Sequence, residues 1–424
     1  MGRYRLARCC HCKLPGLDEP EIQTFRITLR VKFLPLTILT FLFTGPDPGQ
    51  NSILSPASTT GWCNLQTDSA VNHLLFGDRS EYPVDGDKHF FVRDLNENEF
   101  YTNPVFEPDL ADPTIIRTPD GWFYAYGTEN NWDDGHRLVP VIRSTDLVSW
   151  EYVGDAFTVR PSWKDGGIWA PDISVIEGQY CLYYALSTWG DSNPGIGLAV
   201  ADKPEGPFKD YGRILDSKIS GVTNSIDPSL FRHEQHNYLV WGSLGGGIHL
   251  VELSYDGKRV IGEKIKLAGE AFEAGYIYPR NGYYYLFVST GTCCEGENSQ
   301  YRVVVGRSET LEGPYLTRKG NNLTRYRYWW SPDIDQMDGI ILRGNSTFAG
   351  PGHNGQIITD DRGDDWFIYH AIERSDPLLP GGATRRPLLI DKIAWQDGWP
   401  VINKGNGPSN DSRFIPYLND NSLY

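Results

Sequence analysis

The sequence predicts an all-β fold, a five-bladed β-propeller, and two observations support this prediction. A short polar motif recurs five times, and each copy precedes an aromatic-rich strand by about ten residues. The 424-residue chain has almost no segment with a sustained helical period, whereas short apolar runs alternate with turns. A repeat of roughly 40–60 residues that holds about four strands is typical of one propeller blade. Five such repeats therefore predict five blades.

The repeats place polar residues at one equivalent position. In chain order the motifs are ADP (111–113) before the strand 122–127, APD (170–172) before 180–187, IDP (226–228) before 238–243, FEA (272–274) before 283–289, and GHN (352–354) before 366–370. A closed ring of blades turns equivalent positions toward one axis, so we expect Asp112, Asp227, Glu273 and His353 to meet there. Crowded carboxylates are unfavourable unless they are paired or used in chemistry. Capping of strand ends is the alternative interpretation.

The N-terminal hundred residues differ in composition from the repeats. Residues 33–43 are mostly apolar, too few to cross a bilayer, and suit the hydrophobic region of a signal peptide, with Arg26, Arg30 and Lys32 as its basic flank. A short buried strand or helix is the alternative. We expect an N-terminal extension with this signal-like segment over residues 1–44, linker and loop over 45–102, the propeller over 103–408 and a C-terminal tail over 409–424. The organisation predicts a secreted or periplasmic protein without membrane insertion after signal removal.

The composition limits the partners and the cysteine chemistry. A net charge of −15 disfavours nucleic acid and repels polyuronates, so a neutral partner is expected. Seven cysteines, three of them in the first twelve residues, do not make a disulfide framework, and the cluster at 9–12 lacks a second ligand pair for zinc. Cys293 and Cys294 either form a vicinal disulfide or stay free. We expect a monomer.

Several ordered motifs together indicate a family. They are ADPTII (111–116), WAPDIS (169–174), STWGDSN (187–193), NSIDPSLF (224–231), VWGS (240–243), FEAGYIYPRNGYYYLFVS (272–289), GTCCEG (291–296), VVVGRS (303–308), GPGHN (350–354) and WQDGWPV (395–401). Over residues 103–408 the chain resembles glycoside hydrolase family 43, specifically its arabinanase-like members, the endo-α-1,5-L-arabinanases and α-L-arabinofuranosidases. The resemblance implies an inverting hydrolase that acts on plant cell-wall polysaccharide, either arabinan or arabinoxylan side chains.

The resemblance also implies roles for the shared polar residues. Asp112 takes the position of the general base, Glu273 that of the general acid, and Asp227 that of the carboxylate that orients the acid and raises its pKa. Glycoside hydrolysis by inversion needs such an acid and base on opposite faces of the sugar. His353 matches a histidine near a metal ion, usually calcium, which acts electrostatically. Gly275 departs from the family pattern, which has proline there, so we expect a freer loop around Glu273.

Candidate substrate-binding residues lie close to the repeated motifs. Trp169 precedes the APD motif and Trp132 follows the first strand, and either ring could stack on the apolar face of a sugar. The candidates to bond sugar hydroxyls are Asn224, Ser243, Arg385 and its neighbour Arg386. A surface ion pair is expected for at least one of the two arginines. The charged stretch 130–140 could wall off one end of the cleft and make the enzyme exo-acting.

Three alternatives stay open at this point. The first is an exo-acting α-L-arabinofuranosidase or a β-xylosidase on the same fold, which product analysis would separate from an endo-acting enzyme. The second is a retaining fructan hydrolase on a related propeller, which gives the opposite product stereochemistry. The third is a glycan-binding propeller without catalysis, which would bind arabinan and leave it intact.

Overall fold

The computed structural model describes residues 99–418 and five short strands nearer the N-terminus. The chain divides into two units, residues 1–95 and 96–424. The strands of the first unit are β1 (Arg5–Leu6), β3 (Arg26–Thr28) and β4 (Phe43–Thr44) in one sheet, and β2 (Cys9–Lys13) paired with β5 (Trp62–Leu65) in another. β5 falls within 45–102, the range expected to be linker and loop. The predicted signal-like segment 33–43 lies outside the described residues apart from Phe43.

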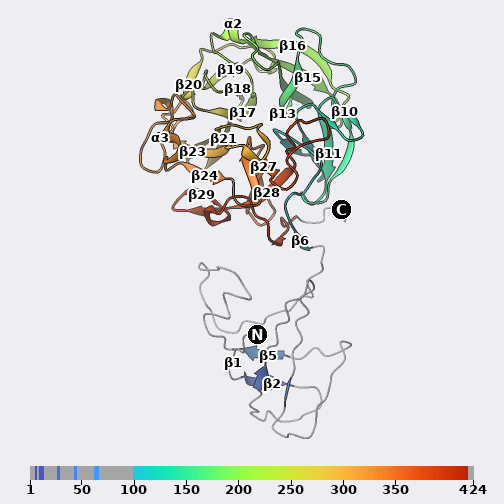
Figure 1. The fold of residues 1–424 in the computed structure, drawn as a ribbon, viewed down its shortest axis with the longest axis vertical. Coiled ribbons are helices and arrows are strands. Elements are labelled where there is room, and N and C mark those ends of the chain that lie inside the picture. The colour runs from blue at the N-terminus through green and yellow to red at the C-terminus, as the bar shows by residue number, and fades with distance from the viewer. Residues whose placement is uncertain are drawn as a thin grey trace. The chain divides into compact units, whose positions relative to one another are not determined.

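Five antiparallel sheets follow one another in chain order around a ring in the second unit (Figure 1). Blade 1 contains β7 (Thr114–Arg117), β8 (Phe123–Tyr126), β11 (Pro140–Ser144) and β12 (Glu151–Asp155), with the hairpin β9 (Asn130–Trp132) and β10 (Gly135–Arg137) between β8 and β11. Blade 2 contains β13 (Gly167–Ile176), β14 (Gln179–Ser187), β15 (Gly195–Ala201) and β16 (Lys209–Asp216). Blade 3 contains β17 (Ser229–His233), β18 (His236–Trp241), β19 (Ile248–Leu253) and β20 (Ile265–Ala268).

The last two blades complete the ring. Blade 4 contains β21 (Glu273–Arg280), β22 (Tyr283–Thr290), β23 (Arg302–Ser308) and β24 (Ile340–Arg343). Blade 5 contains β25 (Phe348–Gly352), β27 (Asp365–Glu373), β28 (Leu388–Gln396) and β29 (Trp399–Ile402), and β26 (Ile358–Thr359) also pairs with β27. The predicted all-β, five-bladed β-propeller is confirmed.

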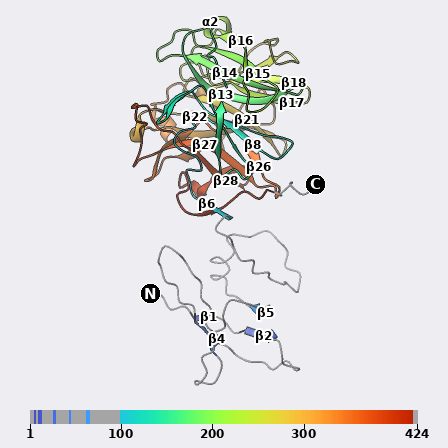
Figure 2. The ribbon, with the colours of Figure 1, turned by 90° about the vertical axis from the view of Figure 1, so that its right-hand side faces the viewer.

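The first strand of each blade lies at the centre of the ring. β7 contacts β13, β13 contacts β17, and β17 contacts β21, so the first strands of blades 1 to 4 adjoin one another in order. The side view shows β13 and β21 near the middle of the described ring (Figure 2). Residues at the start of these strands therefore meet on one axis, as the repeats predict.

Hydrophobic side chains hold neighbouring blades together. Five core clusters lie one between each pair of adjacent blades: Tyr126 packs with Leu182 between blades 1 and 2, for example, and Val240 with Leu286 between blades 3 and 4. Each sheet has neighbours on both faces, so its strands become nearly continuous apolar runs. This accounts for the aromatic run of β14, in which every residue from Cys181 to Ser187 is buried.

The ring closes where the start of the propeller meets its last blade. Val105 and Leu110 donate backbone hydrogen bonds to the carbonyls of Leu388 (2.9 Å) and Arg386 (3.0 Å). β6 (Phe100–Tyr101) pairs with β30 (Arg413–Phe414), so residues on both sides of the expected range 103–408 join the closure.

Helical elements in the described part are short. They are α2 (Ser217–Ser220), α3 (Pro332–Asp335) and the 3₁₀ turns η2 (Gly296–Asn298), η3 (Leu323–Arg325) and η4 (Asn403–Gly405). None of the helices described is long and apolar enough to cross a bilayer.

Candidate active site

A left-handed residue marks the same backbone position in every blade. The five residues and their φ angles are Asp112 (53°), Ala170 (43°), Asp227 (55°), Ala274 (54°) and His353 (44°). A positive φ is uncommon for residues other than glycine and clusters at functional sites. The backbone therefore aligns Ala274, rather than Glu273, with Asp112 and Asp227. The expectation that Glu273 shares their position is wrong by one residue, because the polar residue of the motif and the left-handed residue differ in blade 4.

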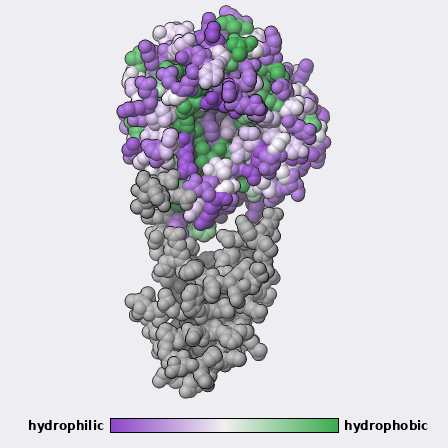
Figure 3. Space-filling view, turned by 180° about the vertical axis from the view of Figure 1, so that it is seen from behind, coloured by the Kyte–Doolittle hydropathy of each residue, from purple (hydrophilic) through white to green (hydrophobic). Residues whose placement is uncertain are grey.

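All five blades contribute to one pocket of about 700 Å³. The predicted site residues that line it are Asp112, Trp169, Asn224, Asp227, Ser243, Glu273 and His353. A space-filling view shows a hollow near the centre of one face of the ring, with hydrophobic residues inside it and hydrophilic residues around it (Figure 3). The ring topology thus brings together residues that lie up to about 240 positions apart in the sequence.

Asp112 is surrounded by hydrogen-bond donors and positive charge. Arg386 donates to its Oδ1 at 2.9 Å, the Thr128 hydroxyl donates to its Oδ2 at 2.6 Å, and His353 Nδ1 lies 3.3 Å from Oδ1. Burial alone would raise the pKa of this carboxyl, but Arg386 and then His353 hold it well below its usual range. Asp112 is therefore ionised at neutral pH.

The pKa values of Asp227 and Glu273 are shifted in the opposite direction, above their usual values. Burial raises the pKa of Asp227 to about 7, and the charges of Glu273 and Asp112 add to the effect of burial. Burial is also the largest cause that raises the pKa of Glu273, against hydrogen bonds from Tyr301 and Ser243 that lower it. We expected Asp227 to raise the pKa of Glu273; desolvation is the largest cause of the rise, and the charge of Asp112 adds to it. Together the two carboxyls retain a proton at a higher pH than ordinary carboxyls do.

Two histidines flank the charged groups. His353 has its pKa raised to about 9, because the attraction of Asp112, Asp227 and Glu273 outweighs burial, which would lower it. His370 is fully buried, and burial together with Arg386 lowers its pKa well below the usual range. Its Nδ1 accepts a hydrogen bond from the backbone N–H of Asp112 at 3.0 Å. His353 thus favours the cation and His370 the neutral form.

Four blades send a polar residue from the end of the second strand to the central strand of the next blade. Thr128 accepts a bond from the Ala170 N–H (2.8 Å), and Ser243 donates to Glu273 Oε2 (2.7 Å). Ser289 accepts from the His353 N–H (2.9 Å), and His370 accepts from Asp112. Thr128 and His370 were not among the predicted site residues. Their sequence signal is a polar residue directly after or at the end of an aromatic strand in each repeat.

Two predicted substrate-binding residues lie elsewhere. Trp132 and Arg385 line a separate cavity of about 720 Å³ and do not line the pocket of the carboxylates. Trp132 is buried against Phe106 and Tyr152, with the Arg137 guanidinium 4.9 Å from its ring centroid. Arg385 forms ion pairs with Glu107, Glu373 and Asp376. The neighbouring Arg386, rather than Arg385, lines the pocket of the carboxylates.

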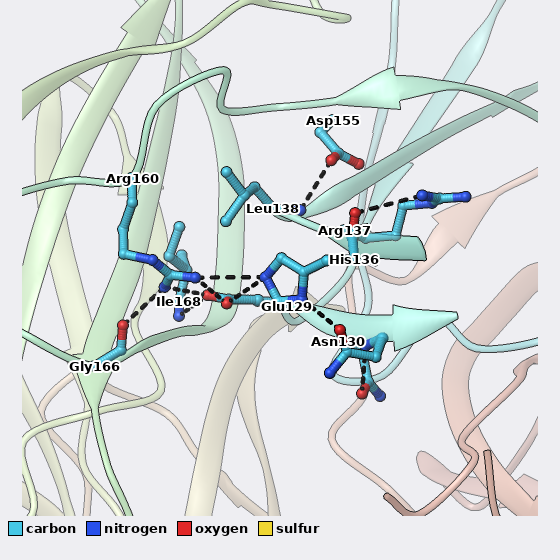
Figure 4. Close-up of polar contacts among 10 residues, drawn as sticks. Glu129, Asn130, His136, Arg137, Leu138, Asp155, Arg160, Gly166 and Ile168 are labelled. Atoms are coloured by element: carbon cyan, nitrogen blue, oxygen red, sulfur yellow. Dashed lines mark hydrogen bonds and ion pairs between the residues drawn. The ribbon is translucent and has the colours of Figure 1, made fainter. Parts of the chain in front are cut away.

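The β9–β10 hairpin lies between these two cavities. Glu129 and Asn130 line the main pocket, whereas Trp132, Asp133, Asp134 and Arg137 line the other cavity. Figure 4 shows how Glu129 holds the base of the hairpin: it pairs with Arg160 and His136 and accepts a 2.7 Å bond from the Ile168 N–H of β13. This network fixes the rim of the pocket between blades 1 and 2.

Two further features of the pocket were open or absent in the sequence analysis. Cys293 and Cys294 form a vicinal disulfide that lines the pocket. Trp189 follows β14, is 80% exposed and packs its ring 5.7 Å from that of Trp169. The pair of tryptophans gives the pocket an aromatic wall on the side of blade 2.

A small cavity on the axis of the ring, next to His353, is the candidate site for a cation. A space of about 20 Å³, enough for one water or ion, is lined by Asp172, Asp227, His353 and Asn354 among others. The buried Oδ1 of Asn354 has no hydrogen-bond partner in the part of the chain described. Among the described residues, no group of three or more His, Cys, Asp or Glu side chains is arranged to hold a metal ion. The donors therefore suit a hard cation held largely through water, and they do not suit zinc.

Comparisons with known proteins establish the family. The family model described as "Glycosyl hydrolases family 43" matches residues 101–400. The chain belongs to glycosyl hydrolase family 43, and it is a glycoside hydrolase by its family and its fold.

Individual relatives agree with this membership. The extracellular endo-α-(1->5)-L-arabinanase 1 of Bacillus subtilis is 34% identical over 305 residues, which cover 69% of this chain and 87% of that protein. The extracellular exo-α-(1->5)-L-arabinofuranosidase of Cellvibrio japonicus is 30% identical, over 70% and 87%. The solved α-L-arabinanase of Cellvibrio cellulosa, in complex with arabinohexaose, matches with a TM-score of 0.60 and 28% identity, over 71% of this chain and 97% of that one.

Proposed function

We propose that this protein is an inverting glycoside hydrolase that cleaves α-1,5-L-arabinan and its oligosaccharides. Asp112 acts as the general base that activates water, and Glu273 acts as the general acid that protonates the leaving oxygen. Asp227 orients the acid: it accepts the 3.2 Å hydrogen bond from the Ala274 N–H and so positions the strand that carries Glu273. Residues 103–408 form the catalytic domain in this proposal.

One observation carries the proposal: a single pocket holds carboxylates of opposite ionisation. Arg386 and His353 keep Asp112 charged, while burial favours a proton on the pair Asp227 and Glu273. An inverting glycosidase needs this combination of ionised base and protonated acid at one working pH. General acid and base groups of this kind contribute roughly 10²–10⁴-fold each.

Arabinan is the substrate that the relatives support. Both an endo-arabinanase and an exo-acting arabinofuranosidase are among them, each named for an α-1,5 arabinose linkage. Trp169 and Trp189 would stack on sugar rings, and Asn224 would bond a sugar hydroxyl. Ser243 and Arg386 already donate to Glu273 and Asp112, so we assign them to these carboxyls rather than to the sugar.

The test combines products and stereochemistry. Purified protein is incubated with linear α-1,5-arabinan, xylan and fructan, and the products are followed by chromatography and by proton NMR of the new anomeric centre. A ladder of arabino-oligosaccharides would establish endo action, and arabinose alone from the earliest time would establish exo action. Retention of configuration, or release from xylan or fructan alone, would overturn the proposal. Binding to arabinan without hydrolysis would make the protein a glycan-binding propeller.

Two substitutions test the roles of the carboxylates. Asp112→Asn and Glu273→Gln should each fold and lose at least roughly 10²-fold in kcat. Asp120→Asn, in the exposed turn between β7 and β8, is the control and should keep wild-type turnover. Near wild-type turnover of either pocket variant would remove that residue from its role.

Calcium is part of the proposal as a structural ion. His353 in its neutral form and the oxygen donors of the axial cavity would hold it through water, and the bound ion would supply the positive charge that protonated His353 supplies without it. Removal with a strong chelator should lower the melting temperature by a few degrees, and added calcium should restore it. Protein that binds no calcium by elemental analysis and melts unchanged would contradict this part.

Secretion and the monomeric state complete the proposal. Relatives named extracellular and the apolar stretch 33–43 support export with removal of a signal segment. N-terminal sequencing of the native exported protein tests this, since an intact Met1 would contradict it. Light scattering on the purified protein tests the monomer.

A further inference from the structure

An exposed aromatic cluster lies on the long connection between β23 and β24. Tyr328 and Trp330 are 54% and 64% exposed, and their rings lie 5.1 Å apart with a tilt of 35°. Trp329 between them is partly buried and packs against the core shared by blades 3 and 4. One ring thus anchors the segment, while the other two remain more than half exposed, and exposed apolar patches often mark binding sites.

The cluster borders a cavity that adjoins the catalytic pocket. This cavity of about 500 Å³ is lined by Leu244, Gly245, Glu270, Arg327, Tyr328, Trp329 and Trp330. Leu244 also lines the pocket that contains the three carboxylates. The two spaces therefore meet at Leu244, on the side where the ring passes from blade 3 to blade 4.

The protein fixes this aromatic segment to the acid side of the pocket. Ala271 donates its N–H to the carbonyl of Tyr326 (3.2 Å), and the ring of Tyr326 packs edge-on against Phe272, 5.9 Å between centroids. Glu273 follows Phe272 directly. On the other side of the junction, Ser243, which bonds Glu273, directly precedes Leu244. The residues on both borders of the second cavity, Leu244 and the segment after Tyr326, are thus connected to Glu273 through a neighbouring residue.

The position of the acid defines which part of a substrate faces this cavity. A general acid protonates the oxygen of the leaving group, so the leaving part of the chain must lie next to it. The base Asp112 and the Trp169–Trp189 wall belong to blades 1 and 2, away from the blade 3–4 junction. A polysaccharide longer than the catalytic pocket would therefore continue past Leu244 on its leaving-group side.

We propose that Tyr328 and Trp330 form a distal subsite that binds the leaving-group side of a neutral pentose polysaccharide chain. This inference rests on the proposed function. The flat faces of exposed rings suit the apolar faces of sugars, and the one anion and one cation of the cavity, Glu270 and Arg327, give it no net charge. An apolar protein partner is the competing occupant.

The experiment compares a long substrate with a short one. Initial rates of the full chain are measured on linear α-1,5-arabinan and on arabinotriose, for the wild type and for Tyr328→Ala, Trp330→Ala and the double variant. The KM for arabinan should rise by roughly 5- to 10-fold in the double variant with kcat unchanged, because one or two ring contacts are lost. The KM for arabinotriose should not change, because three residues bound across the catalytic pocket leave the distal subsite empty.

Two controls make the comparison specific. Tyr255→Ala removes a ring that is 65% exposed and lines neither cavity, so it should leave both substrates unaffected. Trp330→Phe keeps a ring and should recover most of the arabinan KM. Circular dichroism and the melting temperature confirm that each exposed-site variant is folded.

The outcomes separate this inference from the proposed function. Arabinan hydrolysis with an unchanged KM in the double variant would overturn the distal subsite alone. An equal rise in KM for arabinan and arabinotriose would also overturn it, since the rings would then act within the catalytic pocket. A wild-type protein that does not cleave arabinan would overturn the proposed function and this inference with it.

Discussion

At the scale of single residues, the carboxyl groups in the pocket differ in the pH at which they ionise. Asp112 has a guanidinium, an imidazole and a hydroxyl in contact with it. Asp227 accepts one backbone bond, and burial together with the charges of Glu273 and Asp112 opposes the charge of His353, which lowers its pKa. Opposite charge favours the ionised form, and burial beside a like charge disfavours it. The division between base and acid thus follows from the neighbours of each carboxyl.

The adjacent arginines test this argument. Arg386→Met removes the cation that bonds Asp112, so kcat should fall by roughly 10- to 100-fold as the base loses its position. Loss of the positive charge also raises the pKa of Asp112. The base must be ionised, so activity should begin to fail at a higher pH on the acidic side than in the wild type. The kcat/KM profile against pH measures both effects.

Arg385→Met is the matched control, because Arg385 pairs with carboxylates outside the pocket. It should lower the melting temperature slightly and leave the acidic limb of the profile in place. A similar displacement of that limb in both variants would show that Arg386 has no specific effect on Asp112.

Ser243 provides a test on the alkaline side of the profile. Its hydroxyl donates to Glu273, and this bond stabilises the ionised form and lowers the pKa of Glu273. Ser243→Ala should raise that pKa, so the loss of activity with rising pH should occur at higher pH. Ser187→Ala, which removes a hydroxyl that bonds only within its own loop, should leave the profile unchanged. An unshifted alkaline limb in Ser243→Ala would contradict the assignment.

The sequence predicted these carboxylates but did not distinguish Arg385 from Arg386. Adjacent residues in an extended segment point to opposite sides, so one of two neighbouring arginines faces the pocket and the other faces away. Only the contacts of the folded ring decide which one. Trp132 is a similar case: a tryptophan shortly after the aromatic strand of the first repeat suits a sugar site, but the β9–β10 hairpin places this one at a separate cavity.

At the scale of elements, the blades are joined by bonds from a second strand to the next central strand. The repeat was visible in the sequence because its aromatic strands and polar motifs recur, and it located the pocket correctly. The sequence did not show that Glu273 lies one residue before the position of Asp112 and Asp227. The repeats were aligned by their polar residues, and such an alignment carries no information on backbone conformation. The positive φ at Ala274 reveals that blade 4 places its carboxylate one residue earlier than blades 1 and 3.

Thr128 tests the role of these inter-blade bonds. Its hydroxyl donates to Asp112 of its own blade and accepts from Ala170 of the next. Thr128→Val keeps the shape and loses both bonds, so unfolding free energy should fall by about 1–3 kcal/mol and kcat should fall with it. Thr128→Ser should recover most of both quantities. Full stability of the valine variant in urea denaturation would mean that the bonds do not couple the blades.

At the scale of the whole molecule, the ring depends on a closure that the sequence pattern does not reveal. Blade 5 takes all its long strands from the C-terminal part, and residues before β7 close the ring by bonding to β28 and β30. The sequence placed the first boundary of the propeller at residue 103, in the middle of these closing contacts. No periodicity marks them, because they are side-chain and backbone bonds of an irregular segment.

Asn103 is the clearest point at which to test the closure. Its side-chain amide donates to the Ile390 carbonyl (2.8 Å) and accepts from the Ile390 N–H (3.0 Å), and all these groups are buried. Asn103→Ala leaves both backbone groups of Ile390 without this partner, so unfolding free energy should fall by about 1–3 kcal/mol. Asn410→Ala loses one exposed bond to Thr347 and should cost less than about 0.5 kcal/mol. Asn103 does not line the pocket, so kcat/KM of the folded variant should equal that of the wild type. If the two variants were equally stable, the side chain of Asn103 would add nothing measurable to the closure, and the backbone bonds of the segment and the pairing of β6 with β30 would account for it.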